Sequence, residues 1–402
     1  MPDAATVTAE DVQQAASAVS GYARETPVLP AKRLARELGG ELWLKLENLQ
    51  VTGSFKVRGA INRLRALTDE ERKTGVVAAS AGNHAQAVAW AARDLGTTAT
   101  LFMPAEAPLA KIAAVREYGG EVRLVEGMLH DAFEAAERDV EATGKTLVHA
   151  FDDPLVVAGQ GTVALELQRQ VPAIRTVVVP VGGGGLITGM ALALRAADPS
   201  VRIVGVQAES IAPYAGLEEA DAPSTICDGI AVKKPGKLTG PLVRELVDEV
   251  VTVSDDETAQ AMVHLLERSK QVVEGAGAVG VAALMHGRVK PAEEGATVAV
   301  LSGGNVDATL LVEAIRLGET SAGRRMVLAT KIPDRPGGLA TLLGLVANLG
   351  ANVVDVEHLR DGMDLHVRET AVHLVLQTRG PDHDEQILEA VRDAGYHPRL
   401  ER

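Results

Sequence analysis

The sequence predicts an α/β protein whose parallel sheets form two lobes, followed by a small C-terminal βαββαβ module. Short apolar stretches alternate with helix-like stretches at the spacing of βαβ units. Several apolar stretches run directly into glycine-rich turns, which is typical of strands that lead into helices in parallel sheets. With 402 residues, the chain is too long for one ordinary core, so two or three domains are expected.

The composition is that of a globular protein and argues against some partners. Apolar residues make up 46% and charged residues 23% of the chain, both ordinary values. The formal net charge of -14 argues against nucleic acid and anionic membranes, which bind basic surfaces. A single cysteine, Cys227, permits no internal disulfide and fits a reducing compartment. Without a signal peptide or an apolar run of about 18 residues, we expect a cytoplasmic protein.

The first 320 residues supply the parallel assembly. Residues 8–20 read as a helix with Thr8 as a possible N-cap. A smaller lobe of about residues 52–152 is expected to be inserted into the larger one, with a cleft between them. The predicted strands are residues 41–47, 75–80, 98–104, 119–126, 176–185, 201–209, 249–253 and 296–305.

The pattern changes at a small-residue, basic link, residues 321–325. From there to residue 402 the predicted elements follow the order β-α-β-β-α-β, with the second strand over residues 351–360, which is a ferredoxin-like module. Asp334 stands before Pro336 at the expected start of its first helix. Gly350 and Gly395 are placed to end the two helices.

The first segment that could carry chemistry surrounds Lys56. Ser54 and Phe55 precede this lysine, and Gly53 makes a turn before them. A free lysine has a pKa of about 10.4 and is a poor nucleophile at neutral pH. Desolvation against Phe55 would favour the neutral amine that forms an imine. Taken alone, a solvated lysine in the first turn of a helix is the commoner explanation.

A second segment consists of four glycines between an apolar strand and a helix. These glycines place bare backbone N–H groups at a helix N-terminus, where the amides and the helix dipole favour an anion such as phosphate. The segment has neither the dinucleotide-binding spacing nor the lysine of a P-loop. A tight turn is the alternative, but such a turn needs one or two glycines. The segment is Gly182, Gly183, Gly184 and Gly185, followed by Leu186.

Two further polar segments follow predicted strands. The first can bind a second anion, such as a substrate carboxylate, at the start of a helix. Asn83 could bond a cofactor hydroxyl, whereas a histidine at a helix start, such as His84, is more often a capping or packing group. Ser302 in the other segment could offer a hydroxyl to a heteroaromatic ring, unless that segment is only a turn. The first segment is Ser80, Ala81, Gly82, Asn83 and His84.

These segments all lie at carboxyl ends of predicted strands, so they would converge on one cleft. A lysine, a phosphate site and a carboxylate site together are what a pyridoxal 5'-phosphate (PLP) enzyme acting on an amino acid requires. The stretches SFKVRGA, SAGNHAQAVA, PVGGGGLITG and SGGN resemble, in this order and spacing, the tryptophan-synthase-β-like (fold type II) PLP enzymes. The resemblance covers roughly residues 8–320 and is strongest to threonine and serine dehydratases. VVEGAGAVG (272–280) resembles their short, catabolic type.

The resemblance implies deamination of L-threonine to 2-oxobutanoate and ammonia, and also of L-serine to pyruvate. It implies that Lys56 holds PLP as a Schiff base and then acts as the base at the substrate Cα. Phe55 packs beside the ring, Asn83 bonds its 3'-hydroxyl and Ser302 faces its pyridine nitrogen. Gly182 to Leu186 bind the phosphate, and Ser80 to His84 the substrate carboxylate. Because a serine does not enforce pyridine protonation, the arrangement favours loss of a β-hydroxyl over transamination.

The C-terminal stretch IPDRPGGLATLLGLVANLGANVVDVEH resembles an ACT domain, a regulatory module that often binds amino acids. The likeness implies a branched-chain amino acid as a possible effector and a homo-oligomer, a dimer or tetramer. A pure dimerisation module is the alternative. The residues expected near an effector are Asp334, Arg335, Gly337, Gly338 and Asn352.

One departure and two alternatives belong to the prediction. Some serine racemases of this family carry an acidic cation site where this chain has Gln207. We therefore predict no metal site, with Glu209 as a weak candidate only. The alternative enzymes are a serine racemase or a serine-specific dehydratase. A catalytically silent amino-acid-binding regulator is the alternative from another class, and Lys56 argues against it.

Overall fold

The structure is a computed structural model that describes residues 6–216, 225–359 and 365–401. Its contacts divide the chain into two compact units, residues 1–310 and 311–402. The division falls within α13 (Ala308–Ser321). Among the described residues, no helix has the length and apolarity that crossing a membrane requires.

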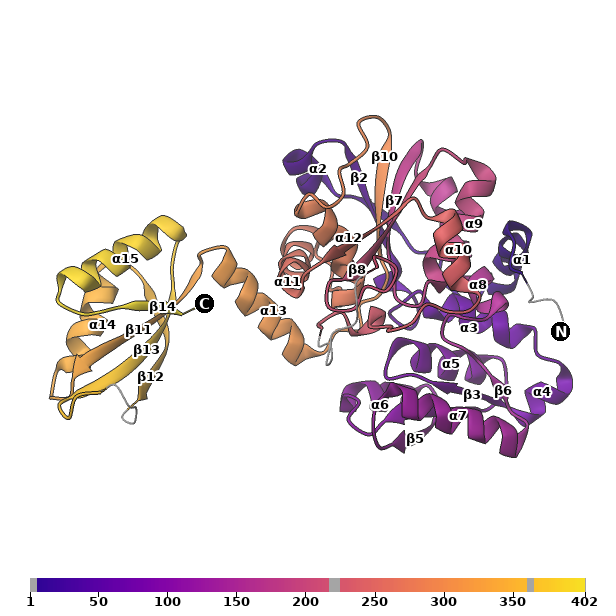
Figure 1. Cartoon of the computed structure of the whole chain (residues 1–402), viewed down its shortest axis with the longest axis horizontal. Helices are drawn as coiled ribbons and strands as arrows, with labels where there is room; N and C mark the ends of the chain where they lie inside the picture. The colour runs from indigo at the N-terminus through magenta and orange to yellow at the C-terminus, as the bar shows by residue number, and fades with distance from the viewer. Residues whose placement is uncertain (1–5, 217–224, 360–364, 402) are drawn as a thin grey trace. The chain divides into compact units, whose positions relative to one another are not determined.

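The larger lobe of the first unit is built on a six-stranded sheet of order β1-β2-β10-β7-β8-β9 (Figure 1). All neighbouring pairs are parallel except β1 with β2. Every residue of β10 is buried, as expected for a strand covered on both faces. The strands are β1 (Val28–Pro30), β2 (Glu41–Leu46), β7 (Ile174–Pro180), β8 (Arg202–Ala208), β9 (Glu249–Val253) and β10 (Ala296–Leu301).

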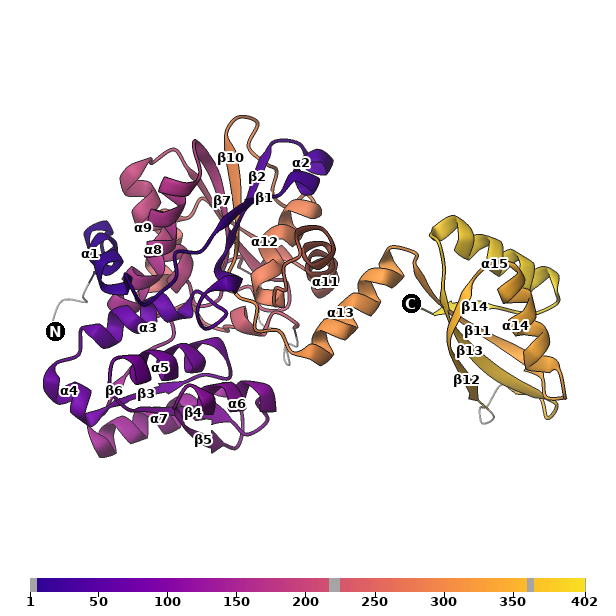
Figure 2. The ribbon, with the colours of Figure 1, turned by 180° about the vertical axis from the view of Figure 1, so that it is seen from behind.

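Helices cover both faces of this sheet, as Figures 1 and 2 show from opposite sides. Valines of β7 and β10 pack with Ile187 and Met190 in a core without buried aromatic side chains, in keeping with the 2% aromatic content. One face carries α1 (Ala9–Val19), α8 (Pro154–Gln170), α9 (Gly185–Ala197) and α10 (Thr239–Leu246). The other carries α2 (Lys32–Leu38), α11 (Asp255–His264), a short π-helix (Leu265–Ser269) and α12 (Gly275–Met285).

The smaller lobe is formed by chain that runs between β2 and β7. Its parallel four-stranded sheet has the order β5-β4-β3-β6. The helix α3 packs against α5 of this lobe and against α8 of the larger one. The strands are β3 (Val76–Ala79), β4 (Ala99–Pro104), β5 (Glu121–Val125) and β6 (Thr146–Leu147). The helices are α3 (Lys56–Arg65), α4 (Asp69–Thr74), α5 (Asn83–Asp94), α6 (Leu109–Glu117) and α7 (Leu129–Thr143).

Most predicted elements of the first unit are present within a few residues of the expected bounds. Thr8 caps α1, with a capping box to Asp11, which confirms that prediction. The sequence pattern missed α12 and α13, which have 11 and 14 residues. It also missed β1, α2, α4, β6 and α10, none of which is longer than eight residues. Elements this short carry too few residues to show a periodicity.

The second unit contains a four-stranded antiparallel sheet of order β12-β13-β11-β14. Alternate residues of β11 and β13 are buried, so one face of the sheet forms a core with α14 and α15. The predicted order β-α-β-β-α-β is therefore present. The elements are β11 (Arg325–Pro333), α14 (Gly338–Asn348), β12 (Asn352–Leu359), β13 (Glu369–Gln377), α15 (Pro381–Asp393) and β14 (Arg399–Glu401).

Two details of this unit differ from the prediction. The helix α14 does not begin at Asp334 and Pro336. It is capped by Gly337 with φ of 88°, because residues 334–337 make a turn first. Gly350 and Gly395 do follow the two helices, with positive φ, as predicted. Arg360, the last residue of the predicted strand 351–360, lies outside the described residues.

Candidate active site

Lys56 is placed by backbone pairing between two segments that are far apart in the sequence. Ser54 and Gly303 form an antiparallel bridge, and the Phe55 N–H donates to the Ser302 carbonyl at 3.1 Å. The chain then enters α3, whose first residue is Lys56. This pairing explains why a segment after β2 and one after β10 contribute side chains to one site.

The amino group of Lys56 lies in a cavity of about 170 Å³. Its Nζ donates to the Ala150 carbonyl at 2.9 Å and lies 5.2 Å from the centre of the Phe55 ring. Desolvation lowers the pKa of Lys56 to about 8, although the carboxylate of Glu274 acts in the opposite direction. A larger fraction of the amine is therefore neutral near pH 7 than for an exposed lysine, as a nucleophile requires.

The glycine loop joins β7 to α9 and is held from outside the cavity. The Gly183 carbonyl accepts hydrogen bonds from Thr239 Oγ1 at 2.6 Å and from the Tyr214 hydroxyl at 3.2 Å. Gly184 has φ of 91°, and a Cβ on Gly183 would fall 2.3 Å from the Phe151 ring. Side chains are thus excluded where the loop turns, and the backbone itself forms the wall of the cavity.

This part of the cavity is rich in donors that have no acceptor among the described residues. In the described ranges, none of the backbone N–H groups of residues 182–186 donates a hydrogen bond to the chain. The buried Gln160 also lines the cavity, and its Nε2 has no partner in the part of the chain that the structure describes. With the N-terminus of α9 added, the donor set fits a phosphate group. Together with the lowered pKa of Lys56, these groups fit PLP.

The segment Ser80 to His84 joins β3 to α5. No acceptor in the described chain takes the backbone N–H groups of Ala81, Asn83 and His84, whereas the Gly82 N–H donates to Ser80 Oγ at 3.1 Å. The free amides lie at the start of a 12-residue helix, where they fit an anion.

The ring of His84 packs in the protein interior. Its Nε2 lies 2.8 Å from the Val148 carbonyl. Burial, with a contribution from the positive charge of Lys56, lowers the pKa of His84 to about 3. The imidazole is therefore neutral at physiological pH, which suits a packing role rather than proton transfer.

Asn83 is oriented by a buried carboxyl group that the sequence interpretation did not single out. Its Nδ2 donates to Glu274 Oε1 at 2.7 Å, and its Oδ1 accepts from Asn305 at 2.8 Å. Burial and the nearby Asp228 raise the pKa of Glu274 to about 7. Glu274 is the only charged residue among apolar and small residues at the start of α12. A charged residue in such a stretch is unusual, and this is the signal by which the sequence could have identified it as a functional residue.

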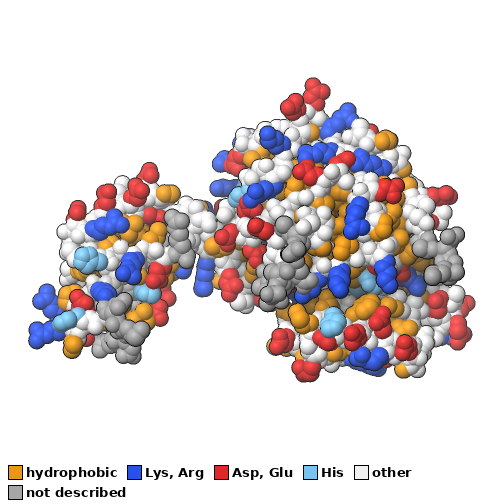
Figure 3. All heavy atoms as spheres, viewed as in Figure 1, with side chains coloured by type: hydrophobic (Ala, Val, Ile, Leu, Met, Phe, Trp, Pro, Cys, Tyr) orange, Lys and Arg blue, Asp and Glu red, His pale blue; other side chains and the backbone are white. Residues whose placement is uncertain are grey.

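The structure brings together in one cavity every residue that was predicted for catalysis, cofactor binding or substrate binding. Lys111, Asp228 and Glu274 line the same cavity and were not predicted. On the face drawn in Figure 3, several Lys and Arg side chains lie along the boundary between the two lobes. The predicted residues that line the cavity are Phe55, Lys56, Ser80, Ala81, Gly82, Asn83, His84, Gly182, Gly183, Gly184, Gly185, Leu186 and Ser302.

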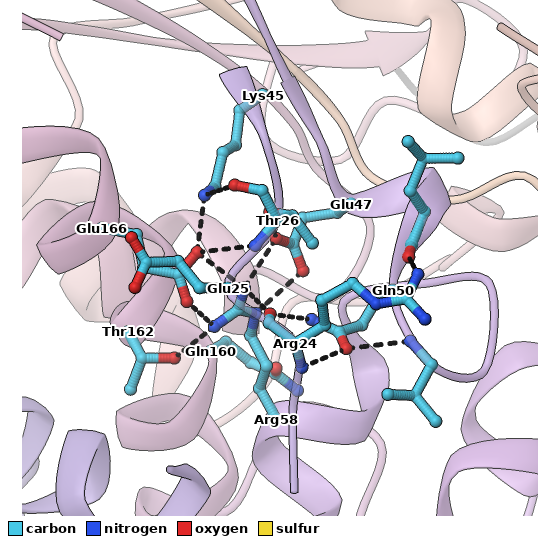
Figure 4. A network of polar contacts seen from close by, with 12 residues as sticks. Arg24, Glu25, Thr26, Lys45, Glu47, Gln50, Arg58, Gln160, Thr162 and Glu166 are labelled. Carbon is cyan, nitrogen blue, oxygen red and sulfur yellow. Dashed lines mark hydrogen bonds and ion pairs between the residues drawn. The ribbon is translucent and has the colours of Figure 1, made fainter. Parts of the chain in front are cut away.

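A buried ionic network (Figure 4) holds the first turn of α3, the helix that begins with Lys56. Arg58, two residues after Lys56, donates to both oxygens of Glu47 at 2.8 Å and to both oxygens of Glu166 at 2.6 and 2.9 Å. Lys45 adds a bond to Glu166 at 2.5 Å. Burial opposes ionisation of Glu47, but the Arg58 guanidinium outweighs it and lowers the pKa of Glu47. The two cations and two carboxylates balance, as buried charges must.

Gln207 has a structural role in the stretch where a cation site was considered. Its Nε2 donates to the Val181 carbonyl at 3.2 Å, and its Oε1 accepts from the Tyr214 N–H at 2.9 Å. It thereby holds the tyrosine that bonds the glycine loop. Glu209 is exposed. The described residues contain no group of three or more His, Cys, Asp or Glu that could hold a metal ion.

The residues predicted near an effector are only partly brought together in the second unit. Asp334, Arg335 and Gly337 line a separate cavity with His358 and Thr370. Gly338 begins α14 beside it. Asn352 pairs with Gln377 at the opposite end of the sheet. The helix α14 leads the chain away from the turn, and β12 then starts at Asn352 and runs back toward the cavity, which His358 lines.

A family model described as "Pyridoxal-phosphate dependent enzyme" matches residues 19–303. The chain belongs to this family of enzymes, and its cofactor is PLP. It is 45% identical to the L-threonine ammonia-lyase of Thermotoga maritima over 98% of this chain and 99% of that protein. It is 43% identical to that of Geobacter sulfurreducens, over 96% and 97%. Among solved structures, maize serine racemase is 36% identical and superposes with a TM-score of 0.74, covering 77% of this chain and 97% of the racemase.

Proposed function

We propose that this chain deaminates L-threonine to 2-oxobutanoate and ammonia, with L-serine, which gives pyruvate, as a second substrate. The observation that carries the proposal is the single cavity that holds the Lys56 amine and two groups of free backbone amides. The names of the two bacterial relatives support threonine as substrate. Bound PLP supplies the electron sink that stabilises negative charge at the substrate Cα.

We assign the roles of the cavity residues from their surroundings. Lys56 would hold the cofactor covalently through Nζ. Once the amino group of the substrate has replaced it there, the free Lys56 amine would take the Cα proton, for which its lowered pKa suits it. The amides of the glycine loop and of Leu186 bind the phosphate. Asn83, oriented by Glu274 and Asn305, directs an amide hydrogen to the cofactor hydroxyl.

Phe55 and Ser302 are assigned to the cofactor ring. Phe55 packs beside it, and the Ser302 hydroxyl faces its nitrogen. Ser302 Oγ donates to the Ala276 carbonyl at 3.5 Å, a long contact that leaves the hydroxyl free to turn. A hydroxyl does not hold a proton on the ring nitrogen as a carboxylate would, and this favours elimination of the substrate β-hydroxyl.

The free amides of the segment Ser80 to His84 are assigned to the substrate carboxylate. With the carboxylate bound there, the β-carbon of the substrate would lie inside the cavity, which Leu129 also lines. The apolar side chain of Leu129 is compatible with the methyl group of threonine.

Steady-state assays of the holoenzyme with L-threonine and L-serine test the proposal. We expect 2-oxobutanoate from threonine and pyruvate from serine, and loss of both products in Lys56→Ala. Serine racemisation is the second candidate, favoured by the likeness to maize serine racemase. Formation of D-serine without 2-oxobutanoate would replace the proposal with that candidate.

We further propose that residues 1–320 form the catalytic domain and that residues 325–402 form an ACT-like regulatory domain. The protein is proposed to assemble as a homo-oligomer. The βαββαβ order supports this assignment, and so does the similarity to the Thermotoga relative over 98% of this chain. Calorimetric titration with isoleucine or valine tests it. Binding that is lost in Arg335→Ala would locate the effector at the turn 334–338, whereas no binding would leave a dimerisation module.

A further inference from the structure

An ion pair spans the cavity from one lobe to the other. Lys111 comes from α6 of the smaller lobe, and its Nζ contacts Asp228 Oδ2 on a short 3-10 helix (Asp228–Ile230) of the larger lobe. Both residues line the cavity that holds Lys56. The Lys111 side chain is only 13% exposed, whereas Asp228 is 56% exposed. The lysine is therefore the inner partner, and the aspartate faces solvent at the edge of the cavity.

Lys111 also lies next to the segment of free amides. A Cβ on Gly82 would stand 3.6 Å from Lys111 Nζ, so the ammonium and the start of α5 are neighbours. The backbone N–H groups of Ala81 and Asn83 find no acceptor in the described chain. A carboxylate placed between them would receive hydrogen bonds from the amides and an ion pair from Lys111.

Without Lys111, this end of the cavity would repel a carboxylate. Asp228 and Glu274 both face it, and the charge of Asp228 contributes to the raised pKa of Glu274, whereas the charge of Lys111 acts to lower it. The ammonium of Lys111 has three hydrogens, so it can donate further bonds besides the one to Asp228, its only ion-pair partner within the described ranges.

We propose that Lys111 recognises the substrate, and that the α-carboxylate of the entering amino acid takes the place of Asp228 at its ammonium. The inference deepens the proposed function and rests on it. Asp228 then competes with the substrate. It keeps the ammonium paired between turnovers and moves into solvent when a carboxylate arrives. The cavity therefore selects amino acids with a free carboxylate over their amides, esters and peptides.

The test is a binding comparison that requires no turnover. The holoenzyme is titrated calorimetrically with L-alanine, which has no β-leaving group, and with L-alaninamide, which has no carboxylate. The visible spectrum of the cofactor is recorded in parallel. Wild-type protein should prefer alanine. Lys111→Met should weaken alanine binding about tenfold to hundredfold, as loss of a charged hydrogen bond does, and leave alaninamide binding nearly unchanged.

A second variant, Asp228→Asn, separates competition from bracing by the direction in which the affinity for alanine changes. Asp228→Asn removes the competitor, so alanine binding should tighten severalfold. Lys111→Arg should restore the preference for alanine. Arg202→Gln breaks an ion pair between β8 and β9 that is remote from the cavity, and it should change neither affinity.

Three results would overturn the inference. In the first, Lys111→Met weakens the binding of alanine and of alaninamide equally. In the second, Lys111→Met and Asp228→Asn both weaken the binding of alanine, as expected if the ion pair only holds the two lobes together. Wild-type protein that does not prefer alanine to alaninamide would also overturn it. Failure of the proposed function is a separate result, because it is read from the absence of 2-oxobutanoate with wild-type enzyme, whatever the alanine titrations give.

Discussion

At the scale of single residues, the reactivity of Lys56 follows from where its amine lies. The cavity walls desolvate the ammonium, and the opposing charge of Glu274 recovers only part of that cost. Glu274 in turn loses charge near neutral pH, because burial raises its pKa to about 7. The two pKa values lie about one unit apart near neutral pH, with the carboxyl group losing its charge below about 7 and the ammonium losing its charge above about 8, which suits a site where protons are moved.

The rate at which apoenzyme takes up PLP should depend on the pH with a midpoint near 8, the lowered pKa of Lys56. Only the neutral amine attacks an aldehyde, so the rate should rise with pH up to this midpoint and level off above it. Stopped-flow absorbance after mixing with PLP measures it. A rate that continues to rise to about pH 10, as for an exposed lysine, would contradict the assignment.

At the scale of elements, two features prepare the cavity: a loop of glycines and a buried ionic network behind α3. The loop works because its backbone lies against Phe151 and Tyr214 with no side chain between them. The network holds Lys56 in position, because α3 begins with Lys56 and carries Arg58, which belongs to the network, within its first turn.

Gly183→Ala should reduce PLP affinity by about fivefold to a hundredfold, because its Cβ would lie 2.3 Å from the Phe151 ring and overpacking of this kind costs about 1–3 kcal/mol. Equilibrium dialysis with PLP measures the affinity. Gly344→Ala is the matched control, since a Cβ added to this residue of α14 would meet no atom within 4 Å. The control should stabilise the protein by about 0.4–1 kcal/mol. Normal PLP affinity in Gly183→Ala would refute the proposed phosphate site.

Arg58→Met should lower the free energy of unfolding by about 3–5 kcal/mol, because it leaves the buried Glu47 and Glu166 without their shared cation. Urea denaturation of the apoenzyme measures the change. Arg33→Gln breaks an exposed pair with Glu37 and should cost less than about 1 kcal/mol. Equal losses in the two variants would show that the network does not stabilise α3.

At the scale of the whole molecule, each of the two units has a hydrophobic core of its own. The core of the second unit is built from β11, β13, α14 and α15, and Leu374 is one of its fully buried members. A core that is complete within 92 residues, 311–402, is large enough to fold cooperatively.

Leu374→Ala should therefore destabilise the second unit selectively. Truncating a buried leucine costs about 2–5 kcal/mol, which in a domain of this size lowers the midpoint by about 10 °C or more. Differential scanning calorimetry should show one transition moving down while the transition that carries the PLP absorbance stays in place. A single transition that moves as a whole would contradict two separately folding units.

Much of this molecule was predictable because its signals are local. Strand and helix patterns, the glycine turns at strand ends and the lysine between Phe55 and Val57 are short stretches, and each can be interpreted without its neighbours in space. The side chains predicted for cofactor and substrate share one cavity because parallel strands place their carboxyl ends at the same edge.

Only the tertiary structure decided how distant segments meet. It brings Glu274 to Asn83 across 191 positions and Lys111 to Asp228 across 117, and no periodicity or motif encodes such pairs. It also separates Asn352 from the turn 334–338, although both were expected at one site. The sequence by itself determined the chemistry that Lys56, the glycine loop and the Ser80 to His84 segment can perform. The fold decided which charges face them, because a carboxyl group or an amine acquires its pKa and its partner from neighbours in space.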